Sequence, residues 1–178
     1  SFKNSIKLNK ASFSFADKKV FENVNVNIEK NKVTVISGGN GTGKSTLINI
    51  ILGLLPLKSG DYLIDDKTIE ISDYNLSHLI GYMPQEINLI DDNIVNNIAF
   101  GENEDEIDYK SLDEISKNLQ FDGLLINRLN DKNFMVGENG QNLSGGQRQK
   151  IVLSRALYRN PEILIMDEPT SEFDEENV

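Results

Sequence analysis

The sequence predicts an α/β fold, in which a mostly parallel sheet carries a phosphate-binding loop. An antiparallel β part is expected near the N-terminus, and a helical insertion in the middle. Three observations support this prediction. A glycine-rich loop at 38–45 stands between an expected strand and an expected helix. The residues from 94 to 158 are mostly helical in pattern. A short apolar run at 163–166 then predicts another strand, and two acidic residues follow it directly.

The first thirty residues indicate a pair of antiparallel strands. Apolar residues alternate in part over Ile6–Phe15 and cleanly at Val24, Val26 and Ile28. Such alternation is typical of strands that bury one face. We expect the turn between the two strands near Asp17.

A strand, a loop and a helix are expected next. The run Lys32–Ser37 is largely apolar and leads into glycines, which favours a strand, and Gly43–Leu52 has a helical pattern. Two shorter strands are expected at Tyr62–Ile64, after a turn at Lys58–Gly60, and at Ile80–Met83.

The middle of the chain predicts helices, over Ile94–Ala99, Tyr109–Leu119, Phe121–Leu129 and Ser144–Tyr158. The acidic tract Glu102–Asp108 indicates a solvated connector between the first two of these helices. Asn160 and Pro161 end the last helix. Ile163–Met166 has the continuous apolar character of a fully buried parallel strand.

Length and charge exclude several classes of function. The chain has 178 residues, the size of one domain with a single core. Its 18 Lys and Arg against 28 Asp and Glu give a net charge of -10, which argues against broad contact with nucleic acid. The absence of cysteine excludes disulfides and thiolate metal sites. The longest apolar stretch, Leu47–Leu57, is too short to span a membrane, and the N-terminus does not resemble a signal peptide.

The loop at 38–45 fits the phosphate-loop pattern G-x-x-x-x-G-K-[ST]. Glycines allow backbone N–H groups to curl around a polyphosphate, and the following helix directs its positive end at the same anion. Lys44 is expected to reach the β- and γ-phosphates, and Ser45 to ligate Mg²⁺. The residues expected to contact the nucleotide through this loop are Gly38, Gly39, Asn40, Gly41, Thr42, Gly43, Lys44, Ser45 and Thr46.

Two carboxylates follow the last predicted strand. Asp167 and Glu168 stand where open α/β sheets place their ligands, at the carboxyl end of a strand. We expect Asp167 to hold Mg²⁺, directly or through water, and Glu168 to act as the general base on the attacking water. The alternative is an ordinary solvated strand end, but a phosphate loop in the same chain favours the catalytic interpretation.

The run Leu143-Ser144-Gly145-Gly146-Gln147 opens a predicted helix. Ser144 as N-cap and Gln147 three residues later predict a capping box. That structural role does not account for the paired glycines, which expose the first N–H groups of the helix to an outside anion.

Together, these motifs and their order resemble the nucleotide-binding domain of ATP-binding cassette (ABC) transporters, over essentially the whole chain. The resemblance implies a P-loop NTPase core with Gly38–Ser45 as Walker A and Ile163–Glu168 as Walker B. Leu143–Gln147 is then the signature, and Gln85 is the Q-loop glutamine, which senses the γ-phosphate and ligates Mg²⁺. Members of this family form head-to-tail dimers. Ser144, Gly146 and Gln147 of one copy would therefore contact the ATP held by another.

The same resemblance places an adenine-stacking aromatic at Phe15, although an aromatic on a half-buried strand is more often part of the core. It also implies one ABC ATPase domain over 1–178, incomplete at its C-terminus. The expected subdomains are an α/β core with its antiparallel part over 1–84 and 159–178, and a helical subdomain over 85–158.

Among ABC transporters, the sequence most resembles the nucleotide-binding domains of exporters. The runs Ile80–Glu86 and Asp91–Gly101 look like exporter sequences, and Val136–Gly140 resembles their X-loop, in which Glu138 would face the transmembrane domain. The implied function is ATP hydrolysis coupled to export, at the cytoplasmic face of the cell membrane. The implied partners are a second nucleotide-binding domain and a transmembrane domain, and not nucleic acid.

The chain departs from the family in two places. The D-loop, Ser171–Asp174, carries Glu172 and Phe173 in place of the usual Ala-Leu. The sequence stops at Val178, before the switch histidine of the family. His78, the only histidine, lies upstream of Gln85 and has a structural or surface role. We therefore expect these residues alone to bind MgATP but to hydrolyse it poorly.

Two other functions stay open from the sequence. One is a soluble ABC-type ATPase that acts on nucleic acid or ribosomes, although the stretch between Gln85 and Leu143 is too short for a long coiled-coil arm. The other is a truncated product with only a binding or inhibitory role. Lipid-linked glycans, lipids, peptides and drugs are all possible cargoes.

Overall fold

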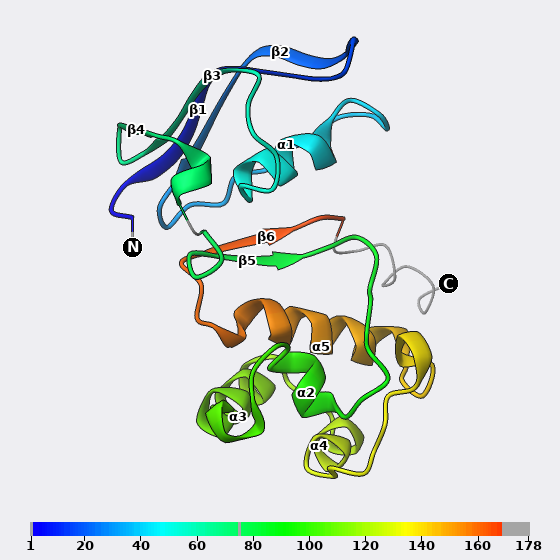
Figure 1. The fold of residues 1–178 in the computed structure, drawn as a ribbon. Helices are drawn as coiled ribbons and strands as arrows, with labels where there is room; N and C mark the ends of the chain where they lie inside the picture. Colours follow the sequence, from blue (N-terminus) through cyan, green and yellow to red (C-terminus); the bar gives the residue numbers. More distant parts are fainter. Residues whose placement is uncertain (1, 75, 169–178) are drawn as a thin grey trace. The chain divides into compact units, whose positions relative to one another are not determined.

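The structure is a computed structural model that describes residues 2–74 and 76–168 (Figure 1). The chain divides into two compact units, Ser1–Ile80 and Gly81–Val178. An antiparallel sheet and one α-helix form the first unit, and four α-helices with a small sheet form most of the second. This division differs from the subdomains expected from the sequence. Residues 81–84 and the last described strand, which the sequence assigns to the α/β core, fall in the helical unit.

The sheet of the first unit has the strand order β2-β1-β3-β4, and each neighbouring pair is antiparallel. Its strands are β1 (Ser5–Phe15), β2 (Lys18–Glu29), β3 (Ser59–Ile64) and β4 (Lys67–Ile69). The predicted pairing of the first two strands is confirmed, with Ile6 opposite Ile28 and Leu8 opposite Val26. The short β4 is an addition to the predicted strands.

Strand β3 starts earlier than predicted, because the expected turn at Lys58–Gly60 is partly strand. Gly60 has φ 94°, and a Cβ there would lie 2.5 Å from the carbonyl oxygen of Lys10 on the neighbouring strand. The glycine therefore permits a close approach of two strands, which is a second common use of glycine in a sheet.

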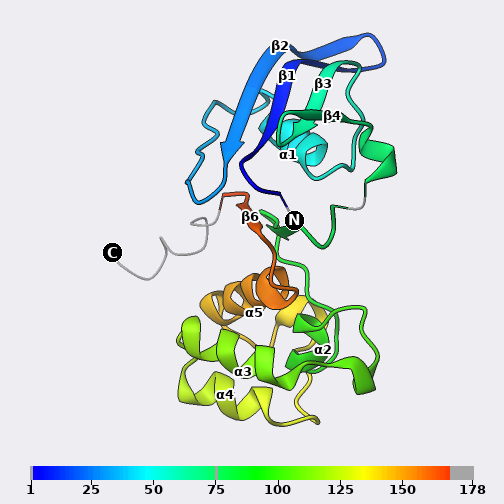
Figure 2. The ribbon, with the colours of Figure 1, turned by 90° about the vertical axis from the view of Figure 1, so that its left-hand side faces the viewer.

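Helix α1 (Lys44–Ile51) lies beside the sheet (Figure 2). The Tyr62 hydroxyl on β3 donates to the carbonyl oxygen of Ile51 at 2.9 Å, and burial raises the pKa of Tyr62 above its ordinary value. Apolar side chains of the helix and the strands form the core of this unit, and it includes Phe2, Ile6, Leu8, Ala11, Phe13, Leu47, Ile48, Ile50, Ile51 and Tyr62.

The strand predicted at Lys32–Ser37 is not formed, and this prediction is wrong for the described structure. Val33 and Val35 are 92% and 81% exposed. Among the described residues, no backbone hydrogen bond reaches residues 33–37. A parallel strand is stable only with a neighbour on its edge, so an apolar sequence alone does not make one.

The second unit begins with a small sheet in which β5 (Ile80–Met83) pairs with β6 (Ile163–Met166). Both strands run in the same direction in Figure 1, and the helices form the crossover that parallel strands require. Both strands were predicted. The full burial predicted for β6 is wrong, since its first three residues are half-buried and Met166 is 47% exposed.

The predicted helices are confirmed as α2 (Ile94–Ile98), α3 (Tyr109–Asn118), α4 (Gly123–Leu129) and α5 (Gly145–Tyr158). The acidic connector is mostly exposed, as expected, and contains the short 3₁₀ turn η2 (Glu104–Glu106). Two more such turns are η1 (Ile71–Asp73) and η3 (Glu138–Gly140). No helix within residues 2–74 and 76–168 has both the length and the apolar character needed to cross a membrane.

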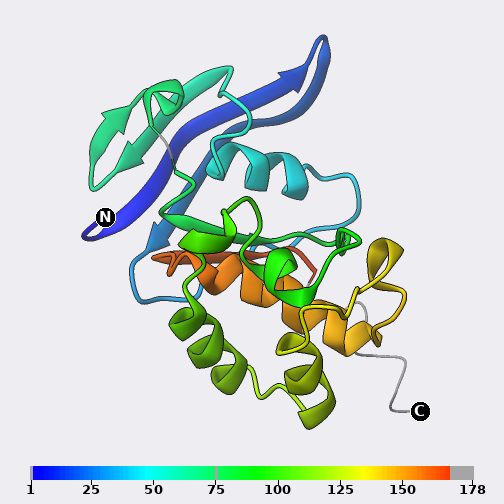
Figure 3. The same ribbon diagram turned by 60° about the horizontal axis from the view of Figure 1, so that its bottom comes forward.

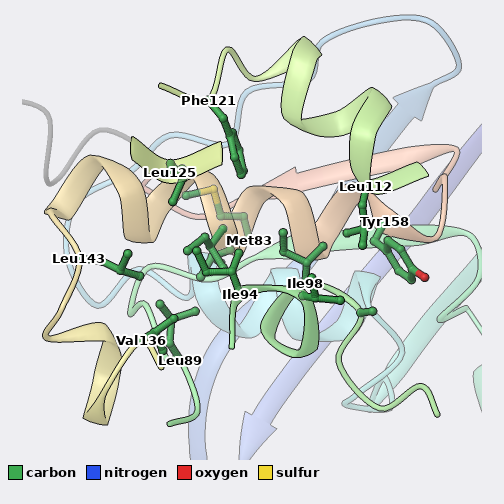
Figure 4. Close-up of a cluster of buried hydrophobic side chains, with 14 residues drawn as sticks. Met83, Leu89, Ile94, Ile98, Leu112, Phe121, Leu125, Val136, Leu143 and Tyr158 are labelled. Atoms are coloured by element: carbon green, nitrogen blue, oxygen red, sulfur yellow. The ribbon is translucent and has the colours of Figure 1, made fainter. Parts of the chain in front are cut away.

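Helix α5 lies between the β5-β6 sheet and the helices α2, α3 and α4 (Figure 1, Figure 3). The buried apolar cluster of this unit (Figure 4) draws on all four helices and on β5, and includes Met83, Leu89, Ile94, Ile98, Leu112, Phe121, Leu125, Val136, Leu143, Ile151, Val152 and Tyr158.

Hydrogen bonds also attach α5 to α2 and to the segment between β5 and α2. Arg155 donates through Nε to the carbonyl oxygen of Asn97 at 2.7 Å and through Nη1 to that of Asn88 at 3.0 Å. Asn97 is fully buried, and its amide nitrogen donates to the carbonyl oxygen of Ile90 at 3.0 Å. Burial lowers the pKa of Arg155. The segment that leaves β5 is therefore held by α5 through hydrogen bonds as well as apolar contacts.

Replacing Gly81 with alanine is expected to destabilise the protein by about 2–3 kcal/mol, because the new methyl group would overpack a closed space. A Cβ at Gly81 would lie 2.2 Å from the carbonyl oxygen of Ala156 and 2.8 Å from Cγ of Pro161. Urea unfolding measures the effect. The matched control is Gly123→Ala, because a Cβ at Gly123 meets no atom within 4 Å. Equal unfolding free energies for the two variants would contradict the close approach of β5 to α5.

Candidate functional site

The glycine-rich loop at 38–45 depends on backbone conformations that favour glycine. Gly41 has φ 76° and Gly43 has φ 94°. Gly43 is the N-cap of α1, and a Cβ there would lie 2.7 Å from Cγ1 of Val20 on β2. A side chain at Gly43 would therefore be strained by its backbone and would also clash with the sheet.

The start of α1 has no side-chain cap. The N–H groups of Lys44, Ser45 and Thr46 belong to the first turn, where a helix supplies no acceptor of its own. Lys44 Nζ donates to the carbonyl oxygens of Gly38 and Gly39 at 2.8 and 3.1 Å, so the loop already curls around an ammonium group. Thr42 Oγ1 closes the loop by donating to Gly39 O at 2.9 Å. These donors and the helix dipole fit a polyphosphate.

Phe15 ends strand β1 and is 52% exposed. Its ring meets that of Phe13 edge to face, with centroids 4.9 Å apart. Phe13 is buried and is therefore the aromatic residue of this strand end that packs in the core, whereas Phe15 is not. One face of an aromatic ring is thus available on the same unit as the phosphate loop.

The two predicted carboxylates follow β6 directly. Asp167 is buried, and its backbone N–H donates to the carbonyl oxygen of Met83 at 3.0 Å. Glu168 is exposed and has φ 47°, so the backbone turns sharply at the end of the strand. Burial raises the pKa of Tyr82, and the nearby charge of Asp167 raises it further.

The structure brings Gln85 and Glu168 together, although 83 positions separate them in the sequence. Gln85 Nε2 donates to Glu168 Oε2 at 2.6 Å. The reason is topological, because β5 and β6 are neighbours and both reach the same edge of their sheet.

The run Leu143–Gln147 begins helix α5 as predicted. Ser144 Oγ accepts from the Gln147 backbone N–H at 3.3 Å, and Gln147 Oε1 accepts from the Ser144 N–H at 3.2 Å, which confirms the capping box. A Cβ at Gly146 would meet no atom within 4 Å, so the first turn is open on that side. In contrast to this open side at Gly146, the side chain of Gln147 is buried.

The predicted site residues lie in both units. Phe15 and the phosphate loop belong to the first unit, and Gln85, Asp167, Glu168 and the start of α5 belong to the second. Glu138 is exposed on η3, and His78 is exposed in a turn. The D-loop at 171–174 lies outside the described residues.

Sequence reasoning missed Asp122 and Arg128, both of which contact Gln147. Asp122 is the N-cap of α4, and its position before an apolar helical run could have predicted that role. No local pattern could have predicted a contact between α4 and the signature, since the residues are 25 and 19 positions apart.

A phosphate loop before a helix without a side-chain cap, two acids at the end of a strand and an open glycine-rich helix start are features of P-loop nucleotide-binding proteins. Within that class, residues 21–171 match the ABC transporter family, and the chain belongs to this family. The predicted fold class, an ABC ATPase with an antiparallel β part and a helical part, is confirmed.

The chain is similar to the ATP-binding parts of known exporters. It is 36% identical over 168 residues to the ATP-dependent lipid A-core flippase of Francisella tularensis subsp. holarctica, a match that covers 93% of this chain and 27% of the flippase. It is 39% identical over 160 residues to a putative export ATP-binding/permease protein of Rickettsia typhi, covering 88% of this chain and 27% of that protein. A bacterial Atm1-family ABC exporter with ATP bound superposes with a TM-score of 0.83 at 28% identity, covering 97% of this chain and 30% of the exporter. The chain thus spans less than a third of the length of these relatives.

Proposed function

We propose that this chain binds and hydrolyses ATP to power an exporter, and that its cycle depends on pairing with a second nucleotide-binding domain. The observation that carries the proposal is the contact of Gln85 with Glu168 at the edge of the β5-β6 sheet. An amide and a carboxylate joined there supply a metal-binding oxygen and a general base side by side. The similarity to exporters supports the coupling to transport.

The first unit would hold the nucleotide. The N–H groups at the start of α1 and the loop Gly38–Ser45 would bind the phosphates, and Lys44 would leave its carbonyl partners to reach the β- and γ-phosphate oxygens. The exposed ring of Phe15 would stack on adenine. The net charge of -10 makes this local group of donors, rather than the overall field, responsible for binding an anion.

The residues assigned to Mg²⁺ offer the oxygen donors that this ion prefers. They are the Ser45 hydroxyl, the Gln85 amide oxygen and the Asp167 carboxylate. Gln85 uses its nitrogen on Glu168, which leaves the amide oxygen for a metal. When bound, Mg²⁺ would neutralise charge that develops on the phosphates.

Glu168 would then act as the general base. Its Oε2 accepts from Gln85 at 2.6 Å, so the amide would orient the carboxylate that takes a proton from the attacking water. The left-handed backbone at Glu168 sets the direction of the side chain. Gln85 therefore has two tasks, one toward the metal and one toward the base.

A second copy would complete each site head to tail. The Ser144 hydroxyl and the N–H groups around Gly146 would approach the γ-phosphate bound to the other copy. Bound ATP would then hold the two copies together, and hydrolysis would allow them to separate. Since each site needs the phosphate loop of one chain and the signature of another, an isolated chain would bind MgATP and hydrolyse it slowly. Exposed Glu138 would face a transmembrane domain at the cytoplasmic side of the membrane.

Glu168→Gln in the full-length protein tests this function. The amide cannot accept a proton from water at neutral pH, so turnover is expected to fall by about a hundredfold or more while ATP binding persists. The variant should accumulate an ATP-bound dimer in the membrane fraction, detected by crosslinking and by nucleotide retained after washing. Failure to form that dimer, or recovery of the protein with ribosomes, would contradict the proposal. The second outcome would favour the soluble ABC-type ATPase.

A further inference from the structure

The side chain of Gln147 is occupied within the helical unit. Its Oε1 accepts from the Ser144 N–H at 3.2 Å and from Arg128 Nη1 at 3.3 Å, and its Nε2 donates to Asp122 Oδ2 at 3.4 Å. The side chain is also buried. An amide oxygen has two acceptor positions, and both are used. Gln147 therefore faces α4 and not the open side of Gly146.

Both partners of Gln147 are themselves held in place. Asp122 is the N-cap of α4, where Oδ1 accepts from the Leu125 N–H at 2.7 Å and leaves Oδ2 for Gln147. Arg128, near the other end of α4, has its guanidinium carbon 4.6 Å from the centroid of the Phe134 ring. It also donates through Nη1 to the carbonyl oxygen of Asn142 at 3.2 Å. One short helix thus contacts the signature amide from both of its ends.

The charges of the partners decide which way the amide points. A carboxylate accepts only, and a guanidinium donates only. The amide nitrogen must therefore face Asp122, and the amide oxygen must face Arg128. The Leu125 N–H lowers the pKa of Asp122, and the hydrogen bond from Gln147 lowers it further, so the carboxylate is charged at neutral pH. A flipped amide would lose both bonds and its bond to the Ser144 N–H.

We infer that Asp122 and Arg128 are positioning residues for the signature. They fix the Gln147 amide, which in turn fixes Ser144 and the first N–H groups of α5 for an anion on a second copy. This gives Gln147 a different task from the ATP contact that the family resemblance implies. It also makes α4 part of the apparatus that sets the signature geometry. The inference rests on the proposed function for its effect on ATP, but the bonded arrangement exists without nucleotide.

Exchanging the amide and the carboxylate tests the inference directly. In Asp122→Asn, the new amide can keep the cap on Leu125, but it then presents a donor to the donor of Gln147. In Gln147→Glu, two carboxylates face each other. In the paired variant, an amide at 122 again donates to an acceptor at 147, and Arg128 keeps an acceptor. Asp113→Asn is the matched control, because it removes the same charge from an exposed helix position that pairs with Lys117.

The first measurement is ATP-driven dimerisation of the full-length protein in the Glu168→Gln background. Each single variant is expected to raise the MgATP concentration needed for dimerisation about tenfold, since a charged hydrogen bond is lost from each of two signatures. MgATP affinity of the separate copies should stay near that of the parent. The paired variant should recover to within about twofold of the parent. Single variants that dimerise like the Asp113→Asn control, or a paired variant without recovery, would overturn the inference.

The second measurement needs no ATP. Hydrogen exchange of the backbone amides at 143–149 in the nucleotide-free protein should be faster in Asp122→Asn than in Asp113→Asn, and should return to the parent rate in the paired variant. Unchanged exchange in Asp122→Asn would overturn the inference even if ATP never causes dimerisation. A parent that fails to dimerise with ATP, while exchange follows the expected pattern, would contradict the proposed function and leave the positioning role supported.

Discussion

Lys44→Ala is expected to lower both MgATP binding and ATP hydrolysis, and hydrolysis by about a hundredfold or more, because no other side chain in the loop at 38–45 is positively charged. Lys44 is a point charge at the start of a helix whose first N–H groups lack a side-chain cap. Removing it also deletes the two hydrogen bonds that brace the loop at Gly38 and Gly39. Equilibrium binding of a fluorescent ATP analogue and phosphate release measure the two losses.

The control for this variant is Lys19→Ala, in the same unit. Lys19 is exposed and pairs with Glu22 three residues later, a contact of the kind that contributes little. It should bind MgATP like the parent. A Lys44→Ala protein that bound and hydrolysed MgATP like Lys19→Ala would contradict the assignment of the loop.

Gly146→Asp is expected to abolish ATP-driven dimerisation and to lower hydrolysis by about a hundredfold, while leaving MgATP binding to each copy unchanged. The position is open, since a Cβ there meets no atom within 4 Å, and a carboxylate in the first turn favours the helix. The fold should therefore tolerate the change. The new charge would instead occupy the direction from which the γ-phosphate of a second copy must approach.

Gly146→Asn separates charge from bulk in that experiment. The amide has nearly the size of the carboxylate but no charge, so it should retain much more ATP-driven dimerisation than the Asp variant. Equal losses in both variants would show that space, and not repulsion of an anion, accounts for the effect. Normal ATP-driven dimerisation of Gly146→Asp would show that the signature does not contact the ATP bound to a second copy.

Features that depend on neighbouring residues could be predicted from the sequence. The capping box of Ser144 with Gln147 spans three positions, and the cap explains where α5 starts. The β1-β2 hairpin follows from alternating residues on both sides of a short turn. Loop and helix at 38–51 follow from glycines that permit left-handed φ values and from the apolar helix after them.

The remaining features depend on partners far away along the chain. Lys32–Ser37 has a strand-like sequence, but a strand forms only where another strand offers its edge. The turn glycine at Gly60 lies inside β3 because Lys10 passes close to it. Similarly, the family pattern indicated that Gln85 and Glu168 serve one site, but only the pairing of β5 with β6 explains their hydrogen bond.

The role of Gln147 illustrates the same limit within the site. Its residue type and spacing predicted a cap and, through the family resemblance, an ATP contact. The structure adds Asp122 and Arg128, which belong to a helix without any motif. Side-chain polarity decided the orientation of the amide, and this could be derived only once the three groups were known to meet.

Two copies of the chain would build each ATP site, one with Lys44 and the other with its signature. The most direct test mixes Lys44→Ala protein with Gly146→Asp protein, both carrying Glu168→Gln, and counts the ATP retained per dimer. Each variant alone should retain almost none. Random pairing should restore one working site in every mixed dimer, or about one quarter of the sites of the parent. A mixture that retained no more ATP than its two components would contradict the claim.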